Sequence, residues 1–303
     1  MKSLPLVSFI TVNYNGIEDT IEFLKSVEKV TYPNIEVIVV DNGSRTDPGV
    51  QLKAQFSFIH YLRSDTNLGF AGGNNLAIKV TKGDYLFFLN NDTILYPDFL
   101  EPIVSFLQSH QDAGMASPKV VFPDERTIQY AGAKGISPFT GRGKRIGLGE
   151  EDRGQYDYCS PTDLGHGAAL IVPRKVIELV GPMPEIYFLY YEEHDWCEQV
   201  KKANFRMYYV GNSKVIHKEA VGTGGQLTPL KVYYMTRSRL LFMRRNSSGA
   251  AQVIGFLFFF LATLPKNLLR FIFQKKPQLA KSFLKAVSWS IGIIFFGAPV
   301  QKT

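Results

Sequence analysis

Short apolar runs alternate with a helical pattern through the first part of the chain. Leu6–Val12, Ile35–Val40, Phe58–Leu62 and Tyr85–Leu89 predict buried strands, because each run is followed by polar residues or glycine. Between the first two runs, apolar residues within Ile17–Val27 recur at spacings of four, three and three, which is typical of a helix. This alternation predicts an α/β fold with a mostly parallel central sheet and right-handed crossovers.

The pattern weakens and then returns in the second half. Pro123–Thr162 is rich in glycine and charge, which predicts long loops or a hairpin. Gly167–Val172 predicts another strand, and helices are expected after Pro173 and from Glu192. Arg206–Val210 predicts a further strand.

The basic residues are concentrated in the C-terminal tail. Residues 231–303 hold 12 of the 34 lysines and arginines and none of the 27 acidic residues, so the first 230 residues carry 22 basic and 27 acidic side chains. A basic patch outside the folded domain argues against a nucleic-acid partner. A basic and apolar tail without acidic residues indicates a segment that binds an anionic membrane surface.

Two apolar stretches in this tail, Val253–Leu264 and Ala286–Val300, have 12 and 15 residues. Both are shorter than the roughly 20 residues that span a bilayer, so they predict amphipathic helices in the membrane interface. The alternative is a pair of helices that dock on the protein core. No small-residue cleavage site follows Leu4–Val12, so we expect a cytoplasmic protein, peripheral on the inner face of the membrane.

Polar residues follow three of the predicted strands. Asn13 and Tyr14, then Asp41, and then Asn90–Asp92 would share the carboxyl edge of the sheet, where open α/β sheets bind ligands. Asp92, flanked by amides, suits a divalent cation and the phosphates that it holds. The alternative is that Asp92 or Thr93 only caps a following helix.

A second polar cluster, Glu192–Asp195, places three carboxylates and one histidine within four residues. Such crowding raises the pKa of one carboxyl group toward that of a general base, although helix N-termini also favour acidic residues. His217 follows a short apolar strand, and its significance depends on whether it shares a metal ion with Asp92. Cys159 and Cys197 are predicted to be reduced core residues.

Five segments in this order resemble the family 2 glycosyltransferases, and within them the bacterial rhamnosyltransferase-like branch. The segments are Val7–Asn15, Val39–Ser44, Asn67–Asn74, Phe88–Thr93 and Tyr190–Trp196. The resemblance extends from about Pro5 to Asn246. It implies a GT-A fold with a catalytic domain at 1–230, a nucleotide-binding half at about 1–115 and an acceptor half at about 116–230. Residues 231–303 would be a separate amphipathic tail.

The resemblance also implies site residues for a nucleotide-diphosphate sugar. Asn13, Tyr14 and Asp41 correspond to nucleoside contacts, and the donor pocket corresponds to Asn67, Gly69 and Asn74. Asn90-Asn91-Asp92 occupies the position of the family's Asp-x-Asp motif, so Asp92 would bind Mg²⁺ or Mn²⁺, with His217 completing the site. The family's general base is the second residue of a Glu-Asp pair. That residue is Glu193 here, a departure by one methylene that keeps Asp195 as an alternative base.

The expected activity is therefore inverting transfer of rhamnose or a similar hexose to a hydroxyl of a glycan, lipid-linked and used in cell-surface polysaccharide synthesis. One alternative is a polyprenyl-phosphate glycosyltransferase. Another is a non-catalytic, membrane-attached protein that binds a nucleotide-sugar or glycan. Gly165–Gly167 is expected to form a floor between donor and acceptor, and Arg142–Arg145 either a lid over the diphosphate or a solvated loop.

Overall fold

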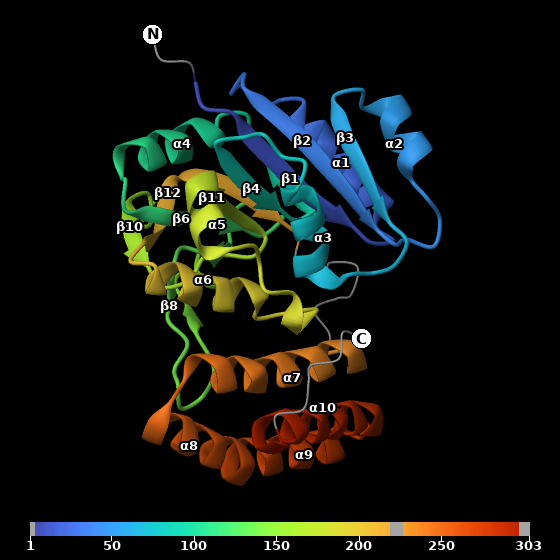
Figure 1. The fold of residues 1–303 in the computed structure, drawn as a ribbon, viewed down its shortest axis with the longest axis vertical. Helices are drawn as coiled ribbons and strands as arrows, with labels where there is room; N and C mark the ends of the chain where they lie inside the picture. Colours follow the sequence, from blue (N-terminus) through green and yellow to red (C-terminus); the bar gives the residue numbers. More distant parts are fainter. Residues whose placement is uncertain (1–3, 219–226, 297–303) are drawn as a thin grey trace.

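A twisted, mixed sheet forms the centre of the protein, in a computed structural model that describes residues 4–218 and 227–296 (Figure 1). Ten strands of the described chain join this sheet, with the path β10-β12-β6-β11-β4-β1-β2-β3, while β5 pairs with β12 and β7 with β6. The strands are β1 Val7–Asn13, β2 Ile35–Asn42, β3 Ile59–Ser64, β4 Tyr85–Leu89, β5 Thr93–Leu95, β6 Ala113–Val121, β7 Ile128–Tyr130, β10 Cys159–Thr162, β11 Ala169–Pro173 and β12 Arg206–His217. A separate hairpin pairs β8 Ala133–Lys134 with β9 Lys144–Arg145.

Strand direction divides the sheet into two parts. β4, β1, β2 and β3 are parallel neighbours, and β12 is parallel to β6. β11 runs antiparallel to both β4 and β6 and so joins the two parallel groups. β5 and β10 also run antiparallel, on β12. The predicted α/β fold with a central sheet flanked by helices is confirmed, and the sheet itself is mixed, with its parallel strands in two groups.

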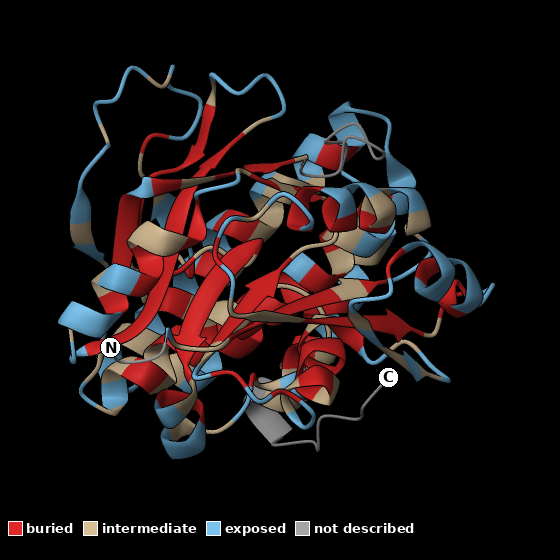
Figure 2. Cartoon of the chain, turned by 90° about the horizontal axis from the view of Figure 1, so that it is seen from above, coloured by how far each residue is buried: buried red, intermediate tan, exposed pale blue. Residues whose placement is uncertain are grey.

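Helices cover the sheet on both faces (Figures 1 and 2). They are α1 Ile17–Val27, α2 Gly49–Gln55, α3 Gly69–Ile78, α4 Leu100–Ser109, α5 Arg174–Val180 and α6 Glu192–Lys202, with a 3₁₀ turn η1 at Glu185–Tyr187. Figure 2 shows the strands as the continuous buried layer. In that layer Phe9 and Phe87 meet edge to face at 5.9 Å, and burial of side chains of this size stabilises the fold by about 1.5–3 kcal/mol each.

One strand was not predicted from the sequence, and one prediction was wrong. β6 is buried along its whole length, although its Ser-Pro-Lys centre does not look like a strand. The charge of Lys119 is accommodated there because its ammonium group pairs with Asp152 and Asp157. The prediction that both cysteines are core residues was wrong for Cys159, which is exposed because β10 is an edge strand; Cys197 is buried.

The C-terminal helices form a second layer below the sheet domain (Figure 1). α7 Pro229–Asn246 is followed by a continuous helix made of α8 Gly249–Phe258, a π-helical segment Phe259–Thr263 and α9 Leu264–Phe273, and then by α10 Pro277–Phe296. Their inner faces share a small apolar core, which includes Leu240, Met243, Phe259, Phe271, Phe283 and Val287. Part of the predicted stretch Ala286–Val300 lies outside the described residues.

The helix Gly249–Phe273 corrects the expectation for one of the two tail segments, Val253–Leu264, because this segment lies within a longer helix. It has 25 residues and is long and apolar enough, by length and composition, to cross a membrane. Only 22% of its most apolar window is buried in the protein. The apolar residues on its outer face, such as Val253, Leu257, Leu261 and Ile272, are exposed. The helix therefore both docks on α7 and presents apolar surface outward.

Candidate active site

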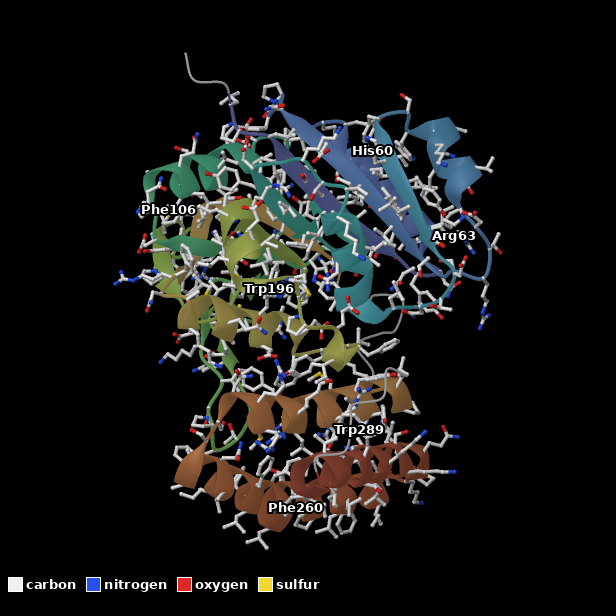
Figure 3. All side chains as sticks on the ribbon, viewed as in Figure 1. His60, Arg63, Phe106, Trp196, Phe260 and Trp289 are labelled. Atoms are coloured by element: carbon white, nitrogen blue, oxygen red, sulfur yellow. The ribbon has the colours of Figure 1, made fainter. Side chains whose placement is uncertain are left out.

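The carboxyl ends of three parallel strands place predicted site residues in one row. The register pairs Asn13 with Asp41 and Asp41 with Arg63, and Figure 3 shows Arg63 near the end of β3. Asp41 is fully buried and accepts hydrogen bonds from Asn13 Nδ2 at 2.8 Å and from the Ser44 backbone N–H at 3.2 Å. Its Oδ2 also lies 2.8 Å from Arg63 Nη1. Asp41 is thus held at the sheet edge, and Tyr14, which follows Asn13 at the end of β1, is exposed.

A carboxylate and an imidazole meet at the next strand end. β5 begins directly after Asp92 and pairs with β12 so that Thr93 lies opposite His217. As a result, Asp92 Oδ1 lies 3.2 Å from His217 Nε2, and Asn90 Nδ2 lies 3.3 Å from the same nitrogen. The Nδ1 atom of His217 lies 2.7 Å from Gln129 Oε1. Since a carbonyl oxygen only accepts, Nδ1 carries a proton, and in the neutral tautomer Nε2 would keep a lone pair that a cation shared with Asp92 could use.

The other predicted donor-pocket residues form hydrogen bonds with neighbouring helices and loops. Asn91 donates to Gly16 O at 3.2 Å and to Thr20 Oγ1 at 3.0 Å, which fastens the end of β4 to α1. Asn67 Oδ1 accepts from the Gly69 N–H at 2.9 Å. Asn74 is buried and donates to Phe70 O. These side chains shape the loops around the strand ends.

Gly69 has a steric role that is visible only in the structure. Its φ is +76°, and a Cβ at this position would lie 2.2 Å from the carbonyl oxygen of Phe188. That oxygen accepts a hydrogen bond of 2.9 Å from the Phe70 N–H. Glycine therefore lets the N-terminus of α3 contact the segment that leads into α6.

The loop Gly165–Gly167 lies between the Asp92–His217 pair and the carboxylate of Glu193 on α6. The ring of His166 lies edge to face with His217, at 5.9 Å between centroids. A Cβ on Gly167 would lie 3.4 Å from Glu193 Oε1, so the absence of a side chain makes room for that carboxylate. Ala168 O accepts from the Asn90 N–H at 2.9 Å. Asp92 and Glu193 thus flank one loop.

His166 is held in its neutral form. Burial, with smaller contributions from His217 and Arg145, lowers the pKa of His166 well below its ordinary value. Its Nδ1 accepts from the Ala168 N–H at 3.3 Å, so the ring proton lies on Nε2.

The three carboxylates in the first turn of α6 have different environments. Asp195 is buried and bound by Arg245 Nε at 2.9 Å and by Asn246 Nδ2 at 2.6 Å, so it anchors the end of α7. Glu193 is partly exposed and lies 3.7 Å from His194 Nδ1. Glu192 is buried, and desolvation together with Glu193 raises its pKa well above the ordinary value.

The segment before α6 adopts an unusual backbone. Phe188, Tyr190 and Tyr191 all have φ between 66° and 74°, a left-handed conformation that costs bulky residues about 1–3 kcal/mol each. Contacts from three sides hold it, including the bond from Tyr191 Oη to Gly141 O at 2.7 Å and the stacking of Phe188 on Tyr234 at 5.0 Å. This segment fixes where α6 begins and thus where Glu193 lies.

Sequence reasoning missed the residues that hold the predicted ones in place. Gln129 lies in a short strand and Arg63 at a strand end, and neither has a local sequence signal. The Arg142–Arg145 segment is neither an isolated lid nor a free loop, because the β8–β9 hairpin tip packs on the tail. A Cβ on Gly141 would lie 2.6 Å from Met243 Sδ, and a Cβ on Gly255 would lie 2.4 Å from Pro138 O.

The site can hold a divalent cation only with help from a ligand. Within residues 4–218 and 227–296, no group of three or more histidine, cysteine or acidic side chains is placed to bind a metal. Asp92 Oδ1 and His217 Nε2 supply one hard oxygen and one imidazole nitrogen. That donor pair suits Mn²⁺ or Mg²⁺ when substrate phosphates and water fill the remaining positions.

Comparison with known proteins identifies the family of the chain. The family model described as glycosyl transferase family 2 matches residues 8–171. The chain is 26% identical over 281 residues to the low-salt glycan biosynthesis hexosyltransferase Agl10 of Haloferax volcanii, covering 90% of this chain and 86% of that protein. It is 25% identical to the dTDP-rhamnosyl transferase RfbF of Shigella flexneri, covering 78% and 79% of the two chains.

The solved structures support the same fold. The mannosyltransferase PcManGT of Pyrobaculum calidifontis, in complex with GDP-Man and Mn²⁺, superposes with a TM-score of 0.59 at 16% identity. The alignment covers 98% of this chain and 80% of that one. The fold is that of the GT-A glycosyltransferases, and the chain belongs to glycosyl transferase family 2.

Proposed function

We infer that the protein transfers a hexosyl group, rhamnose or a similar sugar, from a nucleoside-diphosphate donor to a hydroxyl group of a glycan acceptor, with inversion. The observation that carries this proposal is the position of the Gly165–Gly167 loop. His166 contacts His217 on one side of the loop, and Gly167 contacts Glu193 on the other. One short loop therefore separates two groups of side chains. Asp92 and His217 would hold the metal ion at the leaving group, and Glu193 would act on the attacking hydroxyl.

Asp92 and His217 would hold Mg²⁺ or Mn²⁺. The fit rests on Asp92 Oδ1 and the Nε2 lone pair of His217, which lie 3.2 Å apart. When bound, the cation neutralises charge on the departing diphosphate. The hydrogen bond to Gln129 keeps the imidazole in the tautomer that can act as a ligand. At the far end of the row, Asp41, Asn13 and Tyr14 are the proposed contacts of the nucleoside. Asn67, Gly69, Asn74, Asn90 and Asn91 shape the donor pocket.

Glu193 is the proposed general base. It takes the proton from the acceptor hydroxyl as that oxygen bonds to the anomeric carbon, while the bond between this carbon and the diphosphate oxygen breaks. Asp195 is less suited to this role because Arg245 and Asn246 occupy both of its oxygens. The Nε2–H of neutral His166 is available as a donor that adds no charge beside the cation.

The acceptor is proposed to be lipid-linked and used at the inner face of the membrane. Support comes from the tail, where the helix Gly249–Phe273 exposes apolar residues and the described part contains no acidic side chain. Association with an anionic membrane surface would bring α6 close to such an acceptor.

The test is turnover of a panel of nucleotide-sugars with and without Mn²⁺, measured as release of nucleoside diphosphate. We expect Asp92→Asn and Glu193→Gln each to lower turnover by roughly 10²–10⁴-fold. Asp98→Asn, an exposed carboxylate close in the chain, should leave turnover unchanged. Full turnover by both site variants would refute the proposal, and a sugar recovered on a phosphate would indicate polyprenyl-phosphate transfer instead.

A further inference from the structure

A cavity of about 440 Å³ lies between the β8–β9 hairpin tip and the tail helices. In Figure 1 the hairpin descends from the sheet domain to reach α7 and α8. The cavity is separate from the strand-end site, because its lining comes from residues 140 and 142, α7 and the helix Gly249–Phe273.

Four cationic side chains line this cavity: Arg142, Arg239, Lys266 and Arg270. The tail supplies three of them, and residues 231–303 contain no aspartate or glutamate. None of the four takes part in an ion pair among the described residues. Four unneutralised cations around one hollow indicate a site for an anion.

Arg239 is the unusual member of the group. Its side chain is only 7% exposed, and its Nε is buried without a hydrogen-bond partner in the described chain. Burial, together with the neighbouring charge of Arg142, lowers the pKa of Arg239 to about 10. An unpaired buried guanidinium is costly, and an anion in the cavity would supply the missing acceptor.

Arg237, two residues earlier, is also buried, and its Nε and Nη1 likewise have no hydrogen-bond partner in the described chain. It stacks on Trp289 at 4.0 Å and donates to Ile186 O at 3.2 Å, and Figure 3 shows Trp289 between α7 and α10. Arg239 lies over the face of Phe259, at 5.3 Å, and it lines the cavity, whereas Arg237 does not. An anion in the cavity would therefore meet Arg239 and not Arg237.

The apolar residues around the cavity indicate that the anion is attached to an apolar group. Phe258 and Ala262 form part of its wall, and both are exposed. They continue into the outward apolar residues of the same helix, including Leu257 and Leu261. A soluble anion would gain nothing from this surface, whereas an anion attached to a hydrocarbon chain would bury it.

The cavity is also linked to the carboxylates of α6. Tyr191 immediately precedes Glu192 and donates to Gly141 O, beside Arg142. Arg239 and Arg142 favour the ionised form of Tyr191, and Glu193 opposes it, so all three charges lie within electrostatic reach of one side chain. A headgroup held in the cavity would be close to the proposed base.

We propose that this cavity binds the phosphate or diphosphate group of a lipid, with Arg239 at its base, Arg142, Lys266 and Arg270 at its rim, and the hydrocarbon chain along Phe258 and Leu261. If the ligand is the phosphate of a lipid-linked acceptor, the proposal rests on the function proposed above. If it is the headgroup of a membrane phospholipid, the proposal is independent of that function. The two sources share one chemistry and are separated by the choice of probe.

The experiment measures binding to the full chain without any sugar donor, so its outcome does not depend on turnover. The probes are farnesyl diphosphate below its micelle concentration, inorganic pyrophosphate, and vesicles of phosphatidylglycerol or phosphatidylcholine. The test variant is Lys266→Glu with Arg270→Glu. The matched control, Lys276→Glu with Lys281→Glu, makes the same charge change on exposed tail residues away from the cavity.

We expect the test variant to weaken binding at least roughly tenfold, and the control to stay within about twofold of the wild type. Loss of farnesyl diphosphate binding identifies the lipid-diphosphate source, and loss confined to phosphatidylglycerol vesicles identifies the phospholipid source. Arg239→Gln should have the same effect as the test variant, with circular dichroism used to check folding.

Three outcomes would overturn the proposal. One is pyrophosphate binding as tight as that of farnesyl diphosphate, which would make the site one for a soluble anion. Another is equal weakening by the test and control pairs, which would indicate diffuse attraction. The third is unchanged lipid binding in a correctly folded test variant.

Discussion

The Nε2 atom of His217 lies 3.2 Å from Oδ1 of Asp92, across the antiparallel pairing of β5 with β12. β5 has only three residues, and it brings the polar end of β4 onto the last residue of β12. Gln129 contacts the other ring nitrogen from β7. The orientation of the histidine is therefore fixed by three separate segments of the sheet.

Gln129→Leu should weaken metal binding without removing a ligand. The substitution leaves Nδ1 of His217 without its acceptor, so the ring loses both its tautomer preference and its orientation. We expect the affinity for Mn²⁺ to fall by about 10–100-fold. The measurement is the Mn²⁺ concentration that half-saturates nucleoside diphosphate binding. Gln111→Leu, at an exposed site remote from His217, is the control, and equal affinities in the two variants would exclude this role of Gln129.

Substitution of Glu193 should affect catalysis, whereas substitution of Asp195 should affect stability. Glu193→Gln is expected to lower kcat by roughly 10²–10⁴-fold with no fall in the melting temperature, because the proton acceptor is lost and its repulsion of Glu192 is removed. Asp195→Asn is expected to lower the free energy of unfolding by about 2 kcal/mol, because a charged acceptor of Arg245 is lost. Steady-state kinetics and thermal melts of both variants decide the assignment. A stable but inactive Asp195→Asn protein would make Asp195 the base.

Gly69→Ala tests the contact between α3 and the segment before α6. The new Cβ would lie 2.2 Å from Phe188 O, so the backbone must move. Gly149→Ala is the matched control, since Gly149 has a similar φ of +81° and nothing within 4 Å of the added carbon. We expect a loss of about 1 kcal/mol for the control, from backbone strain alone, and a larger loss for Gly69→Ala. Equal melting temperatures would show that the contact with Phe188 relaxes freely.

The strands and helices that carry a clean apolar period were predictable from the sequence, and so was the row of polar strand ends. β1 and β4 are short buried runs, and their ends hold Asn13 and Asn90 as expected. β6 was missed because Lys119 interrupts it, and only the pairing with Asp152 and Asp157 makes its burial possible.

The partners of the site residues were not predictable, because they depend on long-range pairing. The roles of Gln129, of Arg63 and of the hairpin tip at Gly141 each arise from segments distant in the chain. The difference between Glu193 and Asp195 also depends on α7, about 50 residues further on, which no local pattern shows.

Glu192→Gln should remove a pH dependence of stability. Because burial and Glu193 raise the pKa of Glu192 above its ordinary 4.5, the folded protein retains a proton that the unfolded chain loses. The contribution of Glu192 to stability is therefore complete below pH 4.5 and declines as the pH rises toward the folded pKa, by about 1.4 kcal/mol per pH unit. Glutamine resembles the protonated acid, so wild type and variant should melt at similar temperatures near pH 4.5. The variant should become progressively more stable than the wild type toward pH 8. Parallel melting curves across this range would mean that Glu192 does not retain its proton in the folded protein.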